Sequence, residues 1–324
     1  MSEIPISTKS NVHATALVLP TFNAGTDFPL WLSRLNEQDS RPDRLVLVDS
    51  ASTDQTVAHA RDFGFEVISI PQHEFSHGGT RQMCVEHLSN SDLIVFLTQD
   101  AVLASDQALS RLLRRFDDPQ VGAVYGRQLP RLSAGAIEAH ARLFNYPEES
   151  SIRTIDDIPR LGLKTSFISN SFAAWRRRAL REVGGFPTHT IQNEDTHAAA
   201  RMILAGWKVA YAADACVYHS HAFTWRQEFQ RYFDIGVFHG RDPWIREKFG
   251  TAGGEGYRFV RSELTYLRHH QPSAIPSAVI RTVLKLLGYK IGNHERLLPL
   301  GVKKAFSSNR RFWAYPDHRE MRAS

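Results

Sequence analysis

The stretch DLIVFLTQDA, Asp92 to Ala101, decides the fold of this chain. Its middle, Leu93 to Leu97, is an unbroken apolar run of strand length, which is typical of a parallel strand buried on both faces. The run ends abruptly in Thr98, Gln99 and Asp100. Because open α/β sheets bind ligands at the carboxyl ends of their strands, we expect Asp100 to hold a ligand or a metal. A role in the turn before the next helix is the alternative, since Asp is common in turns.

Two earlier apolar runs form a strand, helix, strand unit with the same property. Residues 14–19 and 44–48 are the predicted strands, and a helical apolar spacing over residues 27–37 separates them. The first strand is followed by Thr21 and Asn23, and the second ends in Asp49 and Ser50. Parallel units of this kind cross over right-handed, so these polar ends share one sheet edge with Asp100. The pattern therefore predicts an α/β fold with a mostly parallel sheet flanked by helices.

Further elements follow the same logic along the chain. We predict a helix over 56–63 capped by Thr53 or Asp54, a strand over 65–70, a helix over 105–116, a strand over 121–125, and two short strands within 207–218. Residues 127–160 have no clear periodicity and are expected to form a long functional loop or a partial helix. We expect a catalytic domain over residues 12–225 and a basic, mainly helical region over 226–324.

The loop PQHEFSHGGTR, residues 71–81, combines histidines, a glycine pair and an arginine just before a helix. Glycine lets backbone approach a ligand closely, and free N–H groups with a guanidinium bind anions. Gly79 and Arg81 are therefore candidate phosphate or diphosphate contacts. An ordinary turn with a surface arginine is the alternative.

Carboxylates and histidines occur at two later positions. Glu194 and Asp195 follow Asn193, a good helix N-cap, so they lie in the first helical turn, where the macrodipole favours ionised carboxylates and keeps a base unprotonated. Capping alone would also explain them. His219 and His221 follow a strand end and can reach a metal held by Asp100, although an isolated HxH is a weak signal.

Composition limits the classes of protein that fit. The chain has 324 residues, two cysteines, Cys84 and Cys216, far apart in sequence, and a net charge of +5. The cysteines provide no disulfide framework, the N-terminus lacks a signal-peptide pattern, and no apolar run is long enough to cross a bilayer, so we expect a cytoplasmic protein. No nucleic-acid partner is expected.

The positive charge is concentrated at the C-terminal end. Residues 258–324 carry 13 Lys or Arg and 4 Asp or Glu, a balance of +9, which leaves −4 for residues 1–257. Within this region, residues 277–291 form an amphipathic, basic helix pattern. Such a helix either packs on the protein body or lies on an anionic membrane surface.

These motifs together resemble the inverting family 2 glycosyltransferases of GT-A (Rossmann-like) fold over about residues 14–240. The resemblance rests on PTFN at 20–23, VDS at 48–50 with STD at 52–54, Asp100, and the pair Glu194 and Asp195. Within the family, the strings FSHGGTR, LTQDA, SFISNSFAAWRR, NED, VYHSH and RYFDIGVFH are similar to bacterial rhamnosyltransferases that build O-antigen and other surface polysaccharides.

The resemblance implies specific roles for these positions. It implies a nucleotide-sugar site in which Asp49 binds the pyrimidine base. It places the catalytic base at Asp195, with Glu194 as a second candidate. It also implies a metal site. The site comprises, for the nucleotide sugar, Pro20, Thr21, Asn23, Asp49, Ser50, Gly79, Arg81, Gln99 and Asp100; for the metal, Asp100, His219 and His221; and for the acceptor, Asn170, Trp175 and Arg201. The sequence departs from the family's DxD metal motif, because Thr98-Gln99-Asp100 supplies one carboxylate where DxD supplies two.

The implied reaction uses a divalent metal, Mg²⁺ or Mn²⁺, with dTDP-L-rhamnose as donor. The acceptor would be a saccharide linked to polyprenyl diphosphate, which would explain a peripheral membrane contact through the basic region. Alternatives are another donor within the same family, a sugar-nucleotide pyrophosphorylase, and a non-catalytic sugar-binding protein. The pyrophosphorylase fits less well, since its glycine-rich loop follows the first strand, where this chain has PTFNAG. A dinucleotide-dependent oxidoreductase is weaker still, because no GxGxxG opens the first helix.

Overall fold

The computed structural model describes residues 13–250 and 254–314. Its strands are β1 (Thr15–Thr21), β2 (Arg44–Asp49), β3 (Glu66–Ser69), β4 (Leu93–Leu97), β5 (Val102–Leu103), β6 (Val121–Leu129), β7 (Ser151–Arg153), β8 (Phe172–Arg176) and β9 (Lys208–Tyr218). Its α-helices are α1 (Phe28–Asn36), α2 (Thr56–Phe63), α3 (His77–His87), α4 (Ala108–Leu113), α5 (Ala136–Asn145), α6 (Ile158–Leu161), α7 (Arg177–Glu182), α8 (Glu194–Leu204), α9 (Trp225–Arg241), α10 (Pro243–Phe249), α11 (Glu255–His270), α12 (Ile275–Asn293) and α13 (Leu300–Phe306). Short 3₁₀ turns join several of them.

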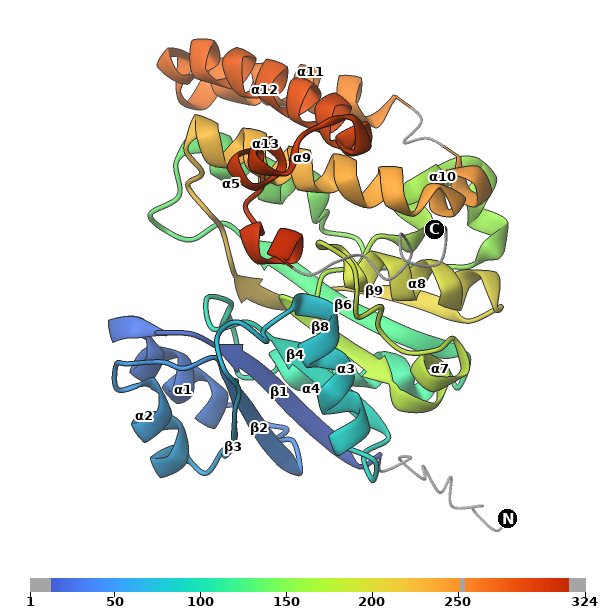
Figure 1. The fold of residues 1–324 in the computed structure, drawn as a ribbon. Coiled ribbons are helices and arrows are strands. Elements are labelled where there is room, and N and C mark those ends of the chain that lie inside the picture. Colours follow the sequence, from blue (N-terminus) through green and yellow to red (C-terminus); the bar gives the residue numbers. More distant parts are fainter. Residues whose placement is uncertain (1–12, 251–253, 315–324) are drawn as a thin grey trace, which may run out of the picture.

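The strands form one nine-stranded sheet in the order β3-β2-β1-β4-β8-β6-β9-β5, with β7 also pairing β9 (Figure 1). Strands β3, β2, β1 and β4 are parallel, and β8 then runs antiparallel between β4 and β6. Strands β6 and β9 are parallel to each other. The predicted α/β fold is thus confirmed, with a parallel half and a mixed half.

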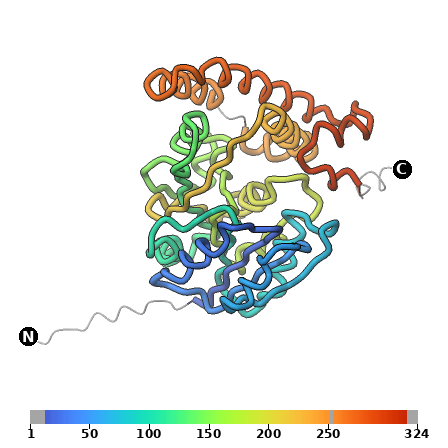
Figure 2. The backbone as a smooth tube through the Cα atoms, turned by 90° about the vertical axis from the view of Figure 1, so that its left-hand side faces the viewer, coloured from blue at the N-terminus to red at the C-terminus, as the bar shows by residue number. Residues whose placement is uncertain are grey.

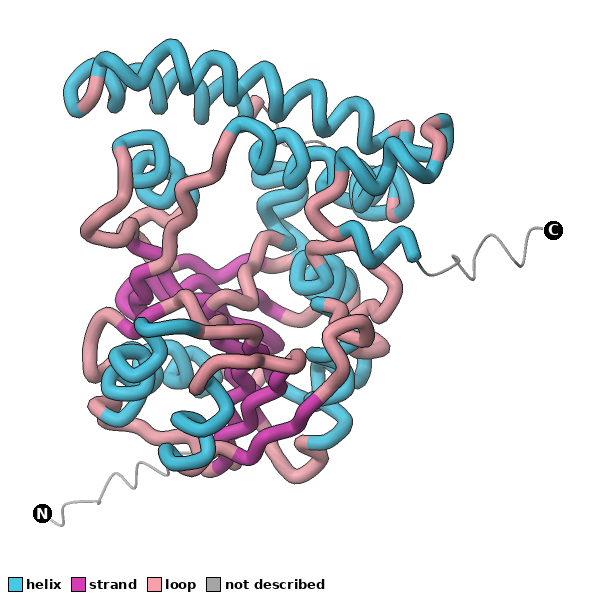
Figure 3. The backbone as a smooth tube through the Cα atoms, turned by 60° about the vertical axis from the view of Figure 1, so that its left-hand side comes forward, coloured by secondary structure: helices cyan, strands magenta, loops and turns pink. Residues whose placement is uncertain are grey.

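Both faces of the sheet are covered by helices, as expected for buried parallel strands (Figure 3). Along β1, Leu17 and Leu19 pack in one core with residues of α1, α2 and α4. The alternate residues Ala16 and Val18 belong to the opposite core, which includes residues of α3, α7, α8 and α9. Because successive side chains of a strand point to opposite faces, this apolar run serves two cores at once.

Several predicted boundaries are wrong. The strand expected over 121–125 continues to Leu129, and the two short strands within 207–218 are one strand, β9, which pairs β6 along its length with a register shift between Gly126 and Arg127. The helix over 105–116 is shorter, α4 followed by a 3₁₀ turn. The expected loop over 127–160 contains α5 and β7. Propensity did not reveal these elements because their pairing partners are distant in sequence.

The C-terminal helices form a layer over the sheet, and α11 and α12 make its outermost hairpin (Figures 1 and 2). Helices α9 and α12 approach closely through glycine: a Cβ at Gly292 would lie 2.0 Å from the Phe233 carbonyl oxygen, and one at Gly236 would lie 2.2 Å from that of Tyr289. The helix predicted over 277–291 is part of α12, and its packing on the protein body is confirmed for the side of α12 that faces α9. Across the described residues, we find no helix with the length and apolar character needed to traverse a bilayer.

Candidate active site

The loops that follow β1, β2 and β4 meet at the carboxyl edge of the sheet, as the strand ends predicted. Asp49 ends β2 and is 3% exposed; its carboxylate accepts hydrogen bonds from the backbone N–H of Ser52 at 2.9 Å and from the Thr21 hydroxyl at 3.4 Å. The Gln99 side chain forms two hydrogen bonds with the backbone of Phe22, at 2.9 and 3.1 Å. Gln99 therefore joins the loop after β4 to the loop after β1.

The β1 and β2 loops are also joined directly. The backbone N–H of Asn23 donates to the Ser52 hydroxyl, and the Asn23 side-chain oxygen accepts from Thr53, each at 2.8 Å. The Ser50 hydroxyl is buried and has no hydrogen-bond partner among the described residues. Pro20 lies within β1, at its carboxyl end. A buried hydroxyl without a partner at such an edge is a position where a ligand atom would complete the hydrogen bonding.

Backbone strain is concentrated in the same loops. Among described residues, the non-glycine residues with positive φ are Asn23 at 45°, Ala51 at 64° and Asn193 at 60°. Asn tolerates the left-handed region, but for Ala it costs roughly 1–2 kcal/mol. Two of these residues lie in the β1 and β2 loops, and the third caps the helix that carries Asp195. Such strain persists where the surroundings enforce it, typically at functional sites.

Asp100 meets both predicted histidines. Its carboxylate oxygen Oδ2 lies 3.4 Å from Nε2 of His219 and 3.4 Å from Nε2 of His221. The turn that carries Asp100 is fixed by Trp31, whose indole N–H donates to the Ala101 carbonyl at 2.8 Å, and by Arg131, which donates to the Asp100 carbonyl at 2.7 Å. Three residues from the ends of β4 and β9 therefore form one compact donor set.

Gln128 determines which nitrogen of His219 faces Asp100. Its side-chain oxygen is 2.9 Å from Nη1 of Arg142 and 2.9 Å from Nδ1 of His219, while its amide nitrogen donates to the Ser169 hydroxyl at 3.0 Å. An arginine has only donors, so the amide oxygen must face it. The same oxygen then accepts the hydrogen of Nδ1, and a neutral His219 directs the lone pair of Nε2 toward Asp100.

This arrangement fits a bound cation. The lone pair of a neutral His219 and the carboxylate of Asp100 face each other at 3.4 Å, so a positive charge between them would relieve the repulsion. Burial acts to raise the pKa of Asp100, but when the histidines carry protons, the hydrogen bond from His219 and the positive charges of His219 and His221 outweigh burial and hold this pKa well below its usual value. A metal cation in place of those protons would act in the same direction. Burial and His219 lower the pKa of His221 to about 4. A carboxylate beside two imidazoles is a set of metal ligands.

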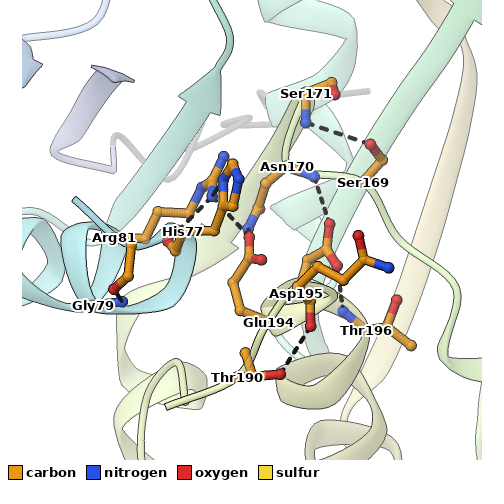
Figure 4. Close-up of polar contacts among 12 residues, drawn as sticks. His77, Gly79, Arg81, Ser169, Asn170, Ser171, Thr190, Glu194, Asp195 and Thr196 are labelled. Atoms are coloured by element: carbon orange, nitrogen blue, oxygen red, sulfur yellow. Dashed lines mark hydrogen bonds and ion pairs between the residues drawn. The ribbon is translucent and has the colours of Figure 1, made fainter. Parts of the chain in front are cut away.

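Asp195 lies at the start of α8 with both carboxylate oxygens bonded. One accepts from the backbone N–H of Asn170 at 3.0 Å and the other from that of Thr196 at 2.7 Å (Figure 4). Burial and the neighbouring charge of Glu194 raise the pKa of Asp195 to about 7. A carboxylate that titrates near neutral pH is suited to take up a proton as a general base.

Glu194 has a different environment. Its oxygen Oε1 accepts from Arg81 at 2.8 Å and from the Asn170 side chain at 3.1 Å, and both Glu194 and Arg81 are at most 5% exposed (Figure 4). Burial acts to raise its pKa, but the charges of Arg81 and His77 hold the pKa of Glu194 below its usual value. Glu194 therefore remains an anion that neutralises Arg81. Its predicted role as a second catalytic base does not fit this buried ion pair.

A chain of hydrogen bonds joins the Asp100 and Asp195 clusters. Gln128 contacts His219 on one side and the Ser169 hydroxyl on the other, and the next residue, Asn170, holds Asp195. The carbonyl of Ser171 accepts from the backbone N–H of Thr98 at 3.3 Å, which ties this segment to the end of β4. Asp100, His219 and Asp195 are thus linked through one continuous set of hydrogen-bonded residues.

Some predicted contacts have other partners in the structure. Trp175 is completely buried, and its indole N–H donates to the Asn170 side chain at 2.8 Å, so it supports Asn170 and does not face an acceptor. Asn170 is 2% exposed, with its amide engaged by Trp175 and Glu194. Arg201 bonds the Gly185 carbonyl. These three predicted acceptor contacts are supporting residues.

The expected anion site at residues 79–81 also has internal partners. The N–H of Gly79 donates to the N-cap Ser76 at 3.1 Å, and the guanidinium of Arg81 is paired with Glu194. The geometry thus places Arg81 next to the candidate base rather than open to a phosphate. Sequence reasoning could not find this because the partner is 113 residues away.

Three residues of the Asp100 cluster were missed from the sequence: Gln128, Arg131 and Arg142. Gln128 lies near the carboxyl end of β6, and Arg131 follows that strand. The rule that strand ends carry functional groups would have found Gln128 and Arg131, had the strand been extended past Tyr125, whereas Arg142 lies in α5 and carries no such signal. The polar run Arg127-Gln128 was the available signal.

Known proteins are similar to this chain in sequence and in fold. The family model described as "Glycosyl transferase family 2" matches residues 16–184. The O-antigen chain rhamnosyltransferases RfbN of Salmonella typhimurium (strain LT2) and WbaN of Salmonella anatum are each 49% identical to this chain over 298 residues, 92% of this chain and 95% of the relative.

Two solved structures share the fold at low identity. The mannosyltransferase PcManGT from Pyrobaculum calidifontis, in complex with GDP-Man and Mn²⁺, has a TM-score of 0.55 at 19% identity and covers 94% of this chain and 86% of its own. S. aureus TarS has a TM-score of 0.52 at 14% identity, covering 87% and 55%. The match to the family model and the identity to the two relatives carry the assignment: the chain is a glycosyltransferase and belongs to glycosyl transferase family 2.

Proposed function

We propose that this enzyme transfers L-rhamnose from dTDP-L-rhamnose to a lipid-linked saccharide during the synthesis of O-antigen or a similar surface polysaccharide. The 49% identity to two O-antigen rhamnosyltransferases over nearly the whole chain supports the sugar and the pathway. The loops of Thr21, Asn23 and Asp49, with the partnerless Ser50 hydroxyl, support a nucleotide site at the edge of the sheet.

The observation that carries the proposal is the pairing of a proton acceptor, Asp195, with a cation site at Asp100 through one hydrogen-bonded segment, residues 169–171. In the reaction, the acceptor hydroxyl oxygen forms a bond to the anomeric carbon of rhamnose while the bond from that carbon to the diphosphate breaks. The diphosphate leaves with the bonding electrons, and the Asp195 carboxylate takes the hydroxyl proton. A single displacement of this kind inverts the anomeric centre.

The leaving diphosphate gains negative charge, and a divalent cation bound by Asp100, His219 and His221 would neutralise it. Two imidazoles beside one carboxylate suit Mn²⁺ better than Mg²⁺, which prefers oxygen ligands. PcManGT, which shares the fold, was solved with Mn²⁺. Thr98-Gln99-Asp100 supplies one carboxylate where the family's DxD motif supplies two. In this proposal His221 provides the additional metal ligand, and it lies as close to Asp100 as His219 does.

Buried neighbours keep the base in position. Asn170 presents its backbone N–H to Asp195 and is itself held by Glu194 and Trp175. Both oxygens of Asp195 retain a lone pair beyond their two hydrogen bonds, so the carboxylate can still accept the proton of the acceptor hydroxyl. Glu194, Asn170 and Trp175 are therefore positioning residues in this proposal.

The donor is tested with the purified full chain, Mn²⁺ and a lipid-linked saccharide acceptor. Release of nucleoside diphosphate is measured with dTDP-L-rhamnose, GDP-mannose and UDP-N-acetylglucosamine in parallel. We expect dTDP-L-rhamnose to be preferred by at least about 100-fold in kcat/KM, since a site that hydrogen-bonds one base leaves groups unpaired with another. Preference for a GDP or UDP sugar would overturn the donor, and release from none of them would overturn the proposed transfer.

A further inference from the structure

The hairpin of α11 and α12 has an outward surface that the fold does not use. It forms the outermost helical layer, on the far side of α9 from the sheet (Figures 1 and 2). Helix α12 packs on α9 through Ala278, Gly288 and Gly292, which are buried. The opposite side of α12 faces away from α9.

Five aliphatic side chains form a stripe along this opposite side. Val279, Ile280, Val283, Leu286 and Leu287 are 49%, 38%, 50%, 58% and 47% exposed. Their spacing of three and four residues places them on one face of the helix. Single exposed apolar residues are ordinary, but a contiguous aliphatic face of this length marks an interaction surface.

Positive charge accompanies the stripe. On the neighbouring helix α11, Arg258, Arg261 and Arg268 are exposed and spaced three and seven residues apart, which places them along one face. Lys290 of α12 is exposed as well. Residues 255–294 contain six Lys or Arg and two acidic residues, Glu255 and Glu263, of which Glu263 is 2% exposed.

Two cations of the hairpin point elsewhere. Arg281 and Lys285 reach Glu228 of α9, at 3.3 and 3.7 Å, and both side chains are largely buried. The cations of α12 that face inward are therefore neutralised within the protein. Of the outward ones, Arg258 pairs with Glu255 at 2.7 Å, whereas Arg261, Arg268 and Lys290 have no acidic partner among the described residues. An aliphatic face beside an excess of positive charge is complementary to a layer with an anionic surface and an apolar interior.

We infer that the outer face of the α11–α12 hairpin docks on a bilayer that contains anionic lipid, with the aliphatic stripe inserted at the headgroup boundary and the arginines of α11 on the lipid phosphates. This inference deepens the proposed function and rests on its lipid-linked acceptor. A layer of helices that includes α5 and α9 lies between the hairpin and the sheet (Figure 1), so docking would hold the active site on the membrane-facing side of the protein, toward the acceptor's sugars.

The test is co-flotation of the full chain with vesicles of phosphatidylglycerol and phosphatidylethanolamine, compared with phosphatidylcholine alone. The stripe variant is Val283→Gln/Leu286→Gln/Leu287→Gln, and the charge variant is Arg258→Gln/Arg261→Gln/Arg268→Gln. The matched control, Leu30→Gln/Ile152→Gln/Leu204→Gln, changes three exposed aliphatic residues outside the hairpin. All nine positions are at least partly solvent-exposed, which favours folded variants.

We expect the wild type and the control to bind anionic vesicles at least about tenfold more tightly than neutral ones, with binding weakened by salt. The stripe variant should lose about tenfold in partitioning, and the charge variant should lose its preference for anionic lipid. Circular dichroism verifies the folding of each variant.

The docking surface is refuted if the wild type stays in solution with anionic vesicles at low salt, or if the folded stripe variant binds as the wild type does. A wild-type dimer in sedimentation equilibrium that the stripe variant abolishes, without vesicle binding, would assign the face to a second copy and overturn the inference. Vesicle binding needs no turnover, so binding without rhamnosyl transfer would support docking while refuting the proposed reaction. Transfer to a water-soluble acceptor analogue should be equal in the wild type and the stripe variant.

Discussion

Two partly buried aspartates near the same edge of the sheet have opposite acid strengths. Asp100 faces two imidazoles and its pKa lies well below the usual value, whereas burial and the charge of Glu194 raise the pKa of Asp195 to about 7. Burial acts on both in the same direction, so the neighbours make the difference. Asp100 remains an anion suited to a cation, and Asp195 is able to gain a proton near neutral pH.

The contrast also corrects the expectation that the dipole of α8 keeps Asp195 ionised. A helix N-terminus stabilises a carboxylate by roughly 0.3–1 kcal/mol. Raising a carboxyl pKa from 3.8 to about 7 corresponds to roughly 4 kcal/mol in the other direction. The dipole is therefore the smaller effect, and removal of Asp195 from water together with the charge of Glu194 decides its ionisation.

The largest expected effect comes from removing the proton acceptor. Asp195→Asn should lower kcat by at least about a thousandfold, because an amide cannot take the hydroxyl proton. In the wild type, kcat/KM should rise with pH up to about 7 and level off above it, since Asp195 is active when deprotonated. Initial rates of nucleoside diphosphate release across pH 5–9 provide the measurement, with the range set around that pKa.

Asp62→Asn, on the exposed side of α2, is the matched control for this substitution. It should retain wild-type rates at every pH. A folded Asp195→Asn variant with near wild-type rates would remove Asp195 from the reaction and end the contrast between the two aspartates.

The next largest effect is expected on Mn²⁺ affinity, from substitutions in the Asp100 cluster. Asp100→Asn should weaken Mn²⁺ binding by about a hundredfold or more, because the amide lacks the negative charge that holds the ion. His221→Gln should weaken it less than His219→Gln, since His221 is more exposed and has no partner like Gln128 to fix its ring. Mn²⁺ electron paramagnetic resonance or calorimetry on the unliganded protein measures these affinities. Unchanged binding in Asp100→Asn would place the metal elsewhere.

Gln128 offers a test of how the His219 ring of the Asp100 cluster is oriented. Gln128→Leu should lower Mn²⁺ affinity by about tenfold, in line with losses typical for a residue that orients a histidine ligand. Nitrogen NMR of the metal-free protein should show that His219 loses its fixed Nδ1–H tautomer. Gln128→Glu keeps the acceptor oxygen and should restore both properties. Gln120→Leu, exposed at the other end of β6, is the control, and an unchanged tautomer in Gln128→Leu would refute this role.

The contrast also shows which parts of the site were readable from sequence. Asp49 and Asp100 were identified because each ends an apolar run of strand length, and the meeting of such ends is a property of parallel sheets. The half of the sheet formed by β1 to β4 was predictable for this reason. Its strands are continuous, buried on both faces and close together in sequence.

The mixed half was harder because its contacts join distant segments. The polar end of β6 does not read as a strand, yet it pairs β9 and presents Gln128 to His219, 91 residues later. Trp175 was expected to contact the acceptor, but it is completely buried in β8. Exposure and long-range pairing depend on tertiary packing, which local patterns do not specify.

The smallest expected effect concerns stability. At pH values between about 4 and 7 the folded protein holds a proton on Asp195 that the unfolded chain has already released, so the contribution of Asp195 to stability falls as pH rises through this window. The Asp195→Asn variant lacks this pH-dependent contribution to stability, because its amide does not titrate. The melting temperature of the variant relative to the wild type should therefore rise by a few degrees between pH 5 and 8.

The absolute stability of the variant is a poorer indicator. The amide has one acceptor for the two N–H donors of Asn170 and Thr196, which adds a cost that is independent of pH. The pH dependence of the difference isolates the ionisation of the carboxylate, and Asp62→Asn corrects for general effects of losing a charge. A difference that stays constant from pH 5 to 8 would mean that Asp195 is as acidic as an exposed aspartate, and the assignment of proton and cation to opposite clusters would lose its electrostatic basis.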